Sequence, residues 1–197
     1  MNMISDILYW ISTGLLVPVI VLLILLFIRS LFLIGGFFGQ YLSIRKAGKV
    51  MKERFDGLTA ENADSLLENL PKGINAMVID YIRRIIAAKD NEALMNKLVS
   101  EFEIAADKDL STSKILTKMG PMLGLMGTLI PMGPALVGLS TGDIASMAYN
   151  MQVAFATTVV GLFASAIGFI TLQIKQRWYM TDMTNLDFLV ETLTENK

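Results

Sequence analysis

The sequence of 197 residues contains no cysteine and no histidine. The first absence excludes disulfides, thiolate metal sites and cysteine nucleophiles, and the second excludes Ser-His-Asp triads and histidine-ligated metal centres. Charged residues are scarce, at 18% against a usual share of about 25%, whereas apolar residues reach 53%. The net charge of −1 gives no reason to expect nucleic-acid binding. This composition indicates a membrane protein with polar segments attached.

Three long segments of the chain carry no charge at all. Residues 7–28, 119–142 and 144–174 contain no Asp, Glu, Lys or Arg. Since a helix needs about 20 apolar residues to cross the hydrocarbon core of a bilayer, these segments predict three transmembrane helices. The third would be about 46 Å long as a helix, so we expect it to be tilted or to extend beyond the bilayer.

The basic residues predict the orientation of these spans. Residues 1–28 and 119–174 contain no Lys or Arg, so the positive-inside rule predicts a multi-pass membrane protein with its N-terminus outside and its C-terminus inside. Arg29 is the borderline case. It either snorkels from the inner end of the first span, which the bracketing by Asp6 and Arg29 favours, or lies deeper and pairs with another group.

We expect an all-α membrane protein with four parts. Residues 1–40 hold the N-terminal segment and the first span, 41–118 a cytoplasmic helical insertion, 119–174 the second and third spans, and 175–197 a cytoplasmic C-terminal helix. The first residues have no basic stretch and no small-residue cleavage site follows the apolar run, so we do not expect a cleaved signal peptide.

Apolar residues at helical spacing predict that the insertion is a helical bundle that continues the membrane helices. One helix covers residues 74–86, a second begins near Leu94 with Asp90 as its N-cap, and a short one precedes them at 63–70, ended by Pro71 and Gly73. In the C-terminal tail, four apolar residues are expected to pack against this bundle: Leu186, Leu189, Val190 and Leu193.

The second and third predicted spans each carry a stripe of small and hydroxyl residues. In the second span it consists of Gly120, Gly124, Gly127, Thr128, Pro131 and Ala135, and in the third of Thr157, Gly161, Ala164, Gly168 and Thr171, with Thr158 and Ser165 beside it. Two interpretations stay open, and they are compatible on different parts of one stripe. Small residues let membrane helices pack closely, and hydroxyl groups line a path for ions or face a partner helix.

Three prolines remove backbone N–H donors from the second predicted span. Pro121 lies near its start and is tolerable there, whereas Pro131 and Pro134 are expected to kink or open the helix. Asp143, in the turn that follows, is expected to cap the third span. It is also the only acid between Lys118 and Lys175, so an acid that carries ions through the membrane must come from another polypeptide.

Two short motifs resemble the MotA/TolQ/ExbB proton channel family. Residues 121–128, PMLGLMGT, resemble the opening of that family's second span, and residues 157–162, TTVVGL, resemble a segment of its third span. With three predicted spans, the chain is similar to the TolQ/ExbB branch. It differs from that branch at Pro131, where a glycine is usual, and at Val153, where a glutamate is usual, so it resembles a divergent member.

The resemblance implies an ion-conducting stator or motor subunit. Such proteins form a homopentamer in the cytoplasmic (inner) membrane around a dimer of a single-span partner of the ExbD/TolR/MotB type, which supplies an Asp within the membrane. They transport H+ or Na+ without a bound cofactor or metal. The resemblance assigns Thr128 and Thr158 to the ion pathway, with Thr157 as a weaker candidate. It implies that Gly127 and Gly161 permit close approach of the partner helix, and it assigns Gly124 and Gly168 with them to contact with that helix or to close helix packing.

A different class of function remains open at this point. If the stripes serve only to pack helices, the chain is a non-conducting membrane scaffold or assembly protein. An enzyme is not expected, because no arrangement of nucleophile, base, nucleotide motif or metal ligands is found in the sequence.

Overall fold

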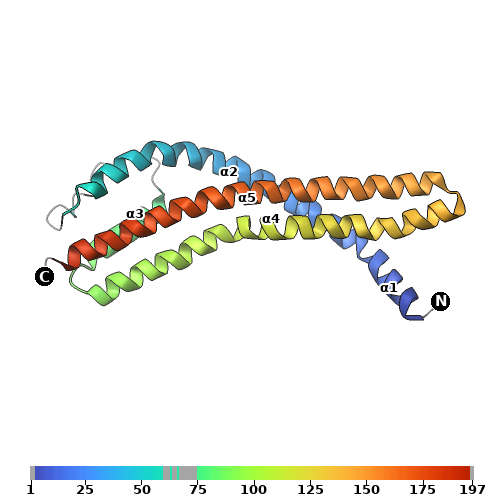
Figure 1. The fold of residues 1–197 in the computed structure, drawn as a ribbon. Coiled ribbons are helices and arrows are strands. Elements are labelled where there is room, and N and C mark those ends of the chain that lie inside the picture. Colours follow the sequence, from blue (N-terminus) through green and yellow to red (C-terminus); the bar gives the residue numbers. More distant parts are fainter. Residues whose placement is uncertain (1–2, 60–62, 64–65, 67–74, 196–197) are drawn as a thin grey trace. The chain divides into compact units, whose positions relative to one another are not determined.

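The protein is described by a computed structural model over residues 3–59, 63, 66 and 75–195. These residues form helices and no strand (Figure 1), which confirms the predicted all-α class. The helices are α1 (Met3–Gly14), α2 (Leu16–Asp56), α3 (Ala76–Ala87), α4 (Glu92–Thr141) and α5 (Ile144–Thr194). Except for the isolated positions 63 and 66, the short helix predicted at 63–70 lies outside the described residues, as do Pro71 and Gly73.

Three stretches of helix are long and apolar enough to cross a membrane. They are Asp6–Leu42, Glu92–Thr141 and Ile144–Thr194. Both α4 and α5 continue without a break from a charge-free segment into a charged one, as predicted for membrane helices that extend into a polar bundle. Length and composition therefore agree with an all-α membrane protein.

The chain forms two compact units. The first unit comprises Met1–Ile34 and Thr112–Leu172, and the second comprises Gly35–Ser111 and Gln173–Lys197. The boundaries lie inside α2, near the middle of α4 and within α5. The four-part division expected from the sequence stays a prediction.

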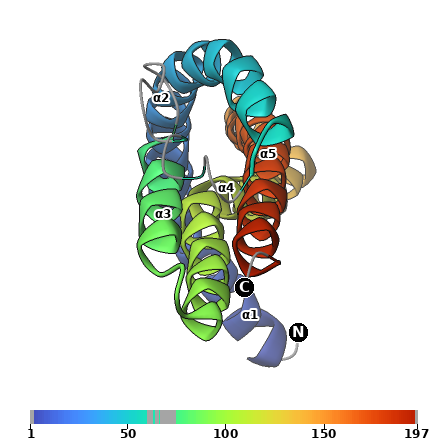
Figure 2. The same cartoon turned by 90° about the vertical axis from the view of Figure 1, so that its left-hand side faces the viewer.

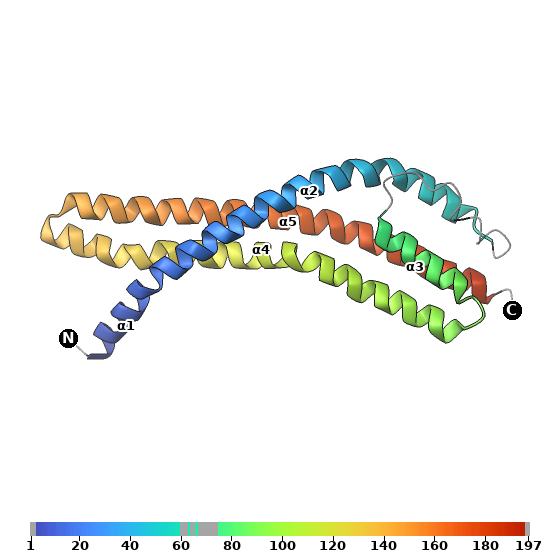
Figure 3. The same cartoon turned by 180° about the vertical axis from the view of Figure 1, so that it is seen from behind.

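In the first unit, α4 and α5 run antiparallel beside each other (Figure 3). A tight turn joins them at Gly142, whose φ of +75° is accessible to glycine at little cost. Asp143 then caps α5, because its Oδ1 accepts a hydrogen bond from the backbone N–H of Ser146 at 3.0 Å. The predicted N-cap is confirmed.

The first half of α2 packs on this helix pair through apolar side chains. Val19 and Leu23 of α2 are buried in one cluster with Leu123 and Ile130 of α4. The ring of Phe27 also lies 5.8 Å from the ring of Phe163 on α5, measured between centroids. The helix is interrupted at Leu15, between α1 and α2. Pro18 therefore lies in the first turn of α2, where its missing N–H removes no hydrogen bond of the helix.

The prolines of α4 do not end the helix. Pro121, Pro131 and Pro134 all lie inside the single helix that ends at Thr141. The helical backbone continues on both sides of each ring, and the predicted kink or local opening at Pro131 and Pro134 stays a prediction.

The second unit is a helical bundle that includes α3, the first half of α4 and the last part of α5 (Figure 2). The ring of Phe102 on α4 connects these helices, since it meets Tyr81 of α3 and Tyr179 of α5 at centroid distances of 5.4 and 6.1 Å. The four apolar tail residues predicted to pack here, Leu186, Leu189, Val190 and Leu193, are all buried. That prediction is confirmed.

The start of α4 differs from the expectation. The N-cap is Asn91 and not Asp90, because the Asn91 Oδ1 accepts a hydrogen bond from the backbone N–H of Leu94 at 3.1 Å. The cap of α3 is also an asparagine, Asn75, whose Oδ1 accepts from the N–H of Met77 at 3.0 Å. Neutral asparagine and charged aspartate cap helices about equally well, so the choice depends on the position at which the preceding turn ends.

The core of the second unit gives a direct test. Leu189 is fully buried, whereas Met180 on the same helix is 65% exposed. We expect Leu189→Ala to lower the free energy of unfolding by about 2–5 kcal/mol through lost burial and the cavity left behind. Met180→Ala is the matched control and should change it by less than about 0.5 kcal/mol. The measurement is denaturant unfolding of the purified protein in detergent, and equal effects of the two variants would contradict this packing.

Candidate functional site

The glycine stripes of α4 and α5 meet each other in the first unit. A Cβ atom added to Gly161 would lie 2.5 Å from the carbonyl oxygen of Gly120 and 2.9 Å from the Cα of Gly124. Farther along the pair, a Cβ atom on Gly168 would lie 2.6 Å from the Cβ of Leu116. Backbone thus contacts backbone, and the interface has no room for a methyl group at Gly161.

Thr157 fills the space that a second glycine leaves. A Cβ atom on Gly127 would lie 2.6 Å from both the Cβ and the Oγ1 of Thr157. The Thr157 side chain is buried there, and its hydroxyl is shared between the carbonyl oxygens of Val153 and Ala154 on its own helix, at 3.0 and 2.9 Å. Contact with a neighbouring helix is the geometry that the packing interpretation requires.

Thr128 and Thr158 have a different environment, because both side chains are only half-buried. The Thr128 hydroxyl donates to the carbonyl oxygen of Leu125 at 2.7 Å, and the Thr158 hydroxyl donates to that of Ala154 at 3.1 Å. Each hydroxyl oxygen keeps acceptor capacity after it has donated its hydrogen. Such an oxygen can coordinate a cation or accept a hydrogen bond from a protonated acid.

The structure brings some of the predicted site residues together and leaves others apart. Gly124, Gly127, Thr157 and Gly161 lie in one contact zone, in which the Cβ position of Gly124 is at an ordinary 3.6 Å from the Cα of Gly161. Gly168 belongs to a separate contact with Leu116. Thr128 and Thr158 each bond to their own helix.

Sequence reasoning missed a set of hydroxyl contacts between α4 and α5. The Ser165 hydroxyl donates to the carbonyl oxygen of Thr117 at 3.0 Å. That carbonyl is available because Pro121, four residues later, has no N–H to donate to it. The buried hydroxyl of Thr171 likewise bonds to that of Ser113 at 3.2 Å. The proline four residues after Thr117 was the signal that could have revealed the first contact.

Comparison with known proteins places these stripes in a family. The MotA/TolQ/ExbB proton channel family matches residues 67–186, more than half of the chain. The chain belongs to this family. No curated protein matches the sequence. The matched range contains both stripes, so the predicted family is confirmed, whereas the branch within it stays a prediction.

Membership of the MotA/TolQ/ExbB family indicates the general function of the protein. It is a proton channel family that couples ion flow to transport and not an enzyme family, and its members work in oligomers with a single-span partner. Among the described residues, no group of three or more His, Cys, Asp or Glu is placed to hold a metal ion.

The contact made by Arg29 bears on where the first span of this MotA/TolQ/ExbB protein ends. Its guanidinium donates to the hydroxyl of Thr112 at 3.2 Å, at an exposed position. Thr112 precedes Lys114 and Lys118, so it lies on the charged side of the second charge-free segment. This contact fits the expectation that Arg29 lies at the end of the first span.

Outside the charge-free segments, α4 and α5 are joined in the second unit by a charged cluster. The Lys175 ammonium lies 2.9 Å from Asp109 Oδ2, and the Tyr179 hydroxyl donates to the same oxygen at 2.8 Å. Burial raises the pKa of Tyr179, and the hydrogen bond to Asp109 and its negative charge raise it further. Tyr179 therefore stays a neutral donor to Asp109.

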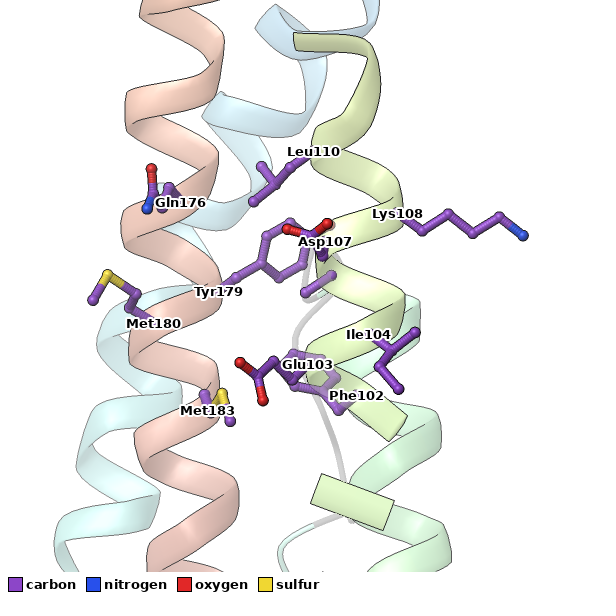
Figure 4. A pocket seen from close by; sticks show the side chains of 11 residues that line it. Phe102, Glu103, Ile104, Asp107, Lys108, Leu110, Gln176, Tyr179, Met180 and Met183 are labelled. Atoms are coloured by element: carbon purple, nitrogen blue, oxygen red, sulfur yellow. The ribbon is translucent and has the colours of Figure 1, made fainter. Parts of the chain in front are cut away.

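A cavity of about 560 Å³ lies beside this cluster, between α4 and α5 of the second unit. Figure 4 shows Tyr179, Met180 and Met183 of α5 on one side and Phe102 and Glu103 of α4 on the other. The Tyr179 hydroxyl is already bonded to Asp109.

Asp182 is the second group with a shifted pKa, and it too lies beyond the charge-free segments. Burial alone raises its pKa from 3.8 to about 7. Its carboxylate is thus penalised in the folded protein and free in water when the chain is unfolded. Asp182 contributes to no ion pair among the described residues.

The glycine contact predicts unequal effects of two similar substitutions. We expect Gly161→Ala to lower the thermal unfolding midpoint of the detergent-solubilised protein clearly, because the new methyl group meets the backbone of α4. Gly124→Ala should be tolerated, because its methyl group would have ordinary contact distances of 3.6 Å. A midpoint that falls as much for Gly124→Ala as for Gly161→Ala would contradict this geometry.

The raised pKa of Asp182 predicts a pH dependence of stability. The folded protein binds a proton at Asp182 more tightly than the unfolded chain does, so stability falls as pH rises from about 4 to about 7 and then levels off. We expect Asp182→Asn to remove this part of the decline. Thermal unfolding of both proteins between pH 4.5 and 8 measures it, and parallel curves would show that the carboxyl group is not desolvated.

Proposed function

We propose that this protein is an ion-conducting stator subunit, which couples proton or sodium flow across the cytoplasmic membrane to mechanical work. The work would serve energised transport or an envelope function, as in the TolQ/ExbB branch. The family match supports the coarse assignment. One observation about the spans carries the specific proposal.

That observation is the absence of an acid where the ion must pass. Residues 119–174 contain Asp143 as their only charged residue, and its carboxylate is engaged as the cap of α5 in the turn. An ion crossing a low-dielectric region needs a negative or strongly polar partner. The missing carboxylate is therefore supplied by a single-span protein of the ExbD/TolR/MotB type.

Apolar surfaces left open in the first unit support assembly around that partner. Large apolar side chains on α4 and α5 are exposed in the isolated chain, among them Leu125, Leu129, Phe155, Val159 and Leu162. Such a surface needs lipid or other copies of the chain to cover it. We assign it to a homopentamer in the inner membrane, with the N-terminus outside and the second unit in the cytoplasm.

Within this assembly, Thr128 and Thr158 are the hydroxyls of the ion pathway. Both are half-buried and both keep acceptor capacity on the oxygen. Thr157 is the weaker candidate, because Gly127 covers it. One elementary charge that crosses 100 mV releases about 2.3 kcal/mol, so several crossings per cycle can drive a conformational change.

The alternative is a non-conducting scaffold, and one observation favours it. The tight contacts at Gly161 and at Gly127 give the small residues a packing role without any ion. The two functions differ in what Thr158 does, since a scaffold needs only its shape.

Ion flux separates the two functions. The protein is reconstituted in liposomes with a single-span partner that carries an Asp near its cytoplasmic end, and acidification of the lumen is followed under an imposed potential. We expect Thr158→Val, which keeps the shape and removes the hydroxyl, to reduce flux at least tenfold with the oligomer intact. A sodium gradient in place of the proton gradient identifies the ion.

Thr184→Val is the matched control for this experiment. Thr184 lies on the same helix and also bonds to the carbonyl four residues earlier, that of Met180, at 3.0 Å, but it lies beyond the charge-free segment. Its variant should conduct like the unmodified protein. Undiminished flux in Thr158→Val would remove Thr158 from the pathway, and no flux in any assembly with the partner would support the scaffold.

A further inference from the structure

The second unit contains a cavity of about 440 Å³ that the channel function does not use. It lies between the last part of α2, the cap of α3 and the C-terminal part of α5. This volume is within the range of small-molecule sites, about 300–1,000 Å³. The cavity is therefore large enough to bury a ligand of about the size of an aromatic amine.

The polar lining leaves two side chains without a partner. Asn75 already accepts a hydrogen bond from Met77, and the Thr181 hydroxyl donates to the carbonyl oxygen of Arg177. Asp182 and Asn185, one turn apart on α5, make no hydrogen bond within the part of the chain that the structure describes. A half-buried carboxylate in this situation lacks the donors that would stabilise its charge.

The apolar lining is preorganised. Met51 and Phe55 of α2 are buried, and Trp178 of α5 is held in place by stacking on Phe37, with ring centroids 5.7 Å apart and an angle of 16° between the rings. A rigid aromatic wall beside an acid is the arrangement that binds cations through both charge and π-electrons.

We propose that this cavity binds an organic cation, an ammonium or guanidinium group attached to an apolar or aromatic body. The cationic group would pair with Asp182 and donate a hydrogen bond to the amide oxygen of Asn185. The apolar or aromatic body would pack against Phe55 and Trp178. This proposal does not depend on ion conduction by the spans.

The other charges at the cavity come from α2. Lys52 and Asp56 also line it, and both are exposed. With Asp182, the described lining has two carboxyl groups against one ammonium, so its net charge favours a cation once Asp182 is ionised. Tyr179 lies near enough to sense the charge of Asp182 and stays neutral. At the start of α3, the described residue that lines the cavity is the uncharged N-cap Asn75.

Trp178 supplies a local probe of binding. The chain has two tryptophans, and the other, Trp10, is 75% exposed on α1, so Trp10→Phe leaves Trp178 as the only indole. Its fluorescence is titrated in the full-length protein with benzylammonium and, separately, with the neutral benzyl alcohol. We expect saturable binding of benzylammonium at least tenfold tighter than that of the alcohol.

Two variants and a pH series decide the result. Asp182→Asn should abolish the preference for the cation, whereas Asp187→Asn, which removes an exposed acid from the same helix, should keep it. Because the pKa of Asp182 is about 7, affinity for benzylammonium should be about tenfold weaker at pH 6 than at pH 8 and independent of pH in Asp182→Asn. Equal affinity for the two probes, no saturable signal, or a preference that survives Asp182→Asn would overturn the proposal.

Discussion

The close approach of α4 and α5 at Gly161 is the constraint on which the first unit depends. A lipid environment gives two apolar helices no hydrophobic reason to associate, so their contact has to come from close packing and polar bonds. Glycine at positions 120, 124 and 161 lets the backbones touch. The distance between the two helices also determines how closely Thr157 packs against Gly127. It places Thr158 beside this contact.

Hydroxyl groups do the polar work where charges would be too costly. The Ser165 hydroxyl donates to the carbonyl oxygen that Pro121 leaves without a backbone donor. A proline is tolerated inside a membrane helix in this way, because a neighbouring helix replaces the missing donor. Thr157, Thr128 and Thr158 donate to their own helices. The paired spans are thereby kept polar at chosen points, and Asp143 in the turn between them is the only charged residue of 119–174.

Charges are gathered in the second unit, and there they are used in two ways. Asp109 is surrounded by donors from Lys175 and Tyr179 and acts as a link between α4 and α5. Asp182, less than two turns from Lys175 on the same helix, has no such donors among the described residues, and burial raises its pKa to about 7. The same residue type is a structural link in one place and an open binding group in the other, because burial without partners destabilises the charged form.

The sequence by itself determined the three spans, the helical class, the cap at Asp143 and the family, since these depend on local spacing, charge and short motifs. It did not reveal that Thr157 is buried against Gly127, nor did it distinguish the bonded Asp109 from the unpartnered Asp182. Only the tertiary structure decided these points. The reason is physical: which residue of α4 lies opposite a residue of α5 some 30 to 70 positions later depends on helix register and crossing geometry, and neither is written in the local pattern.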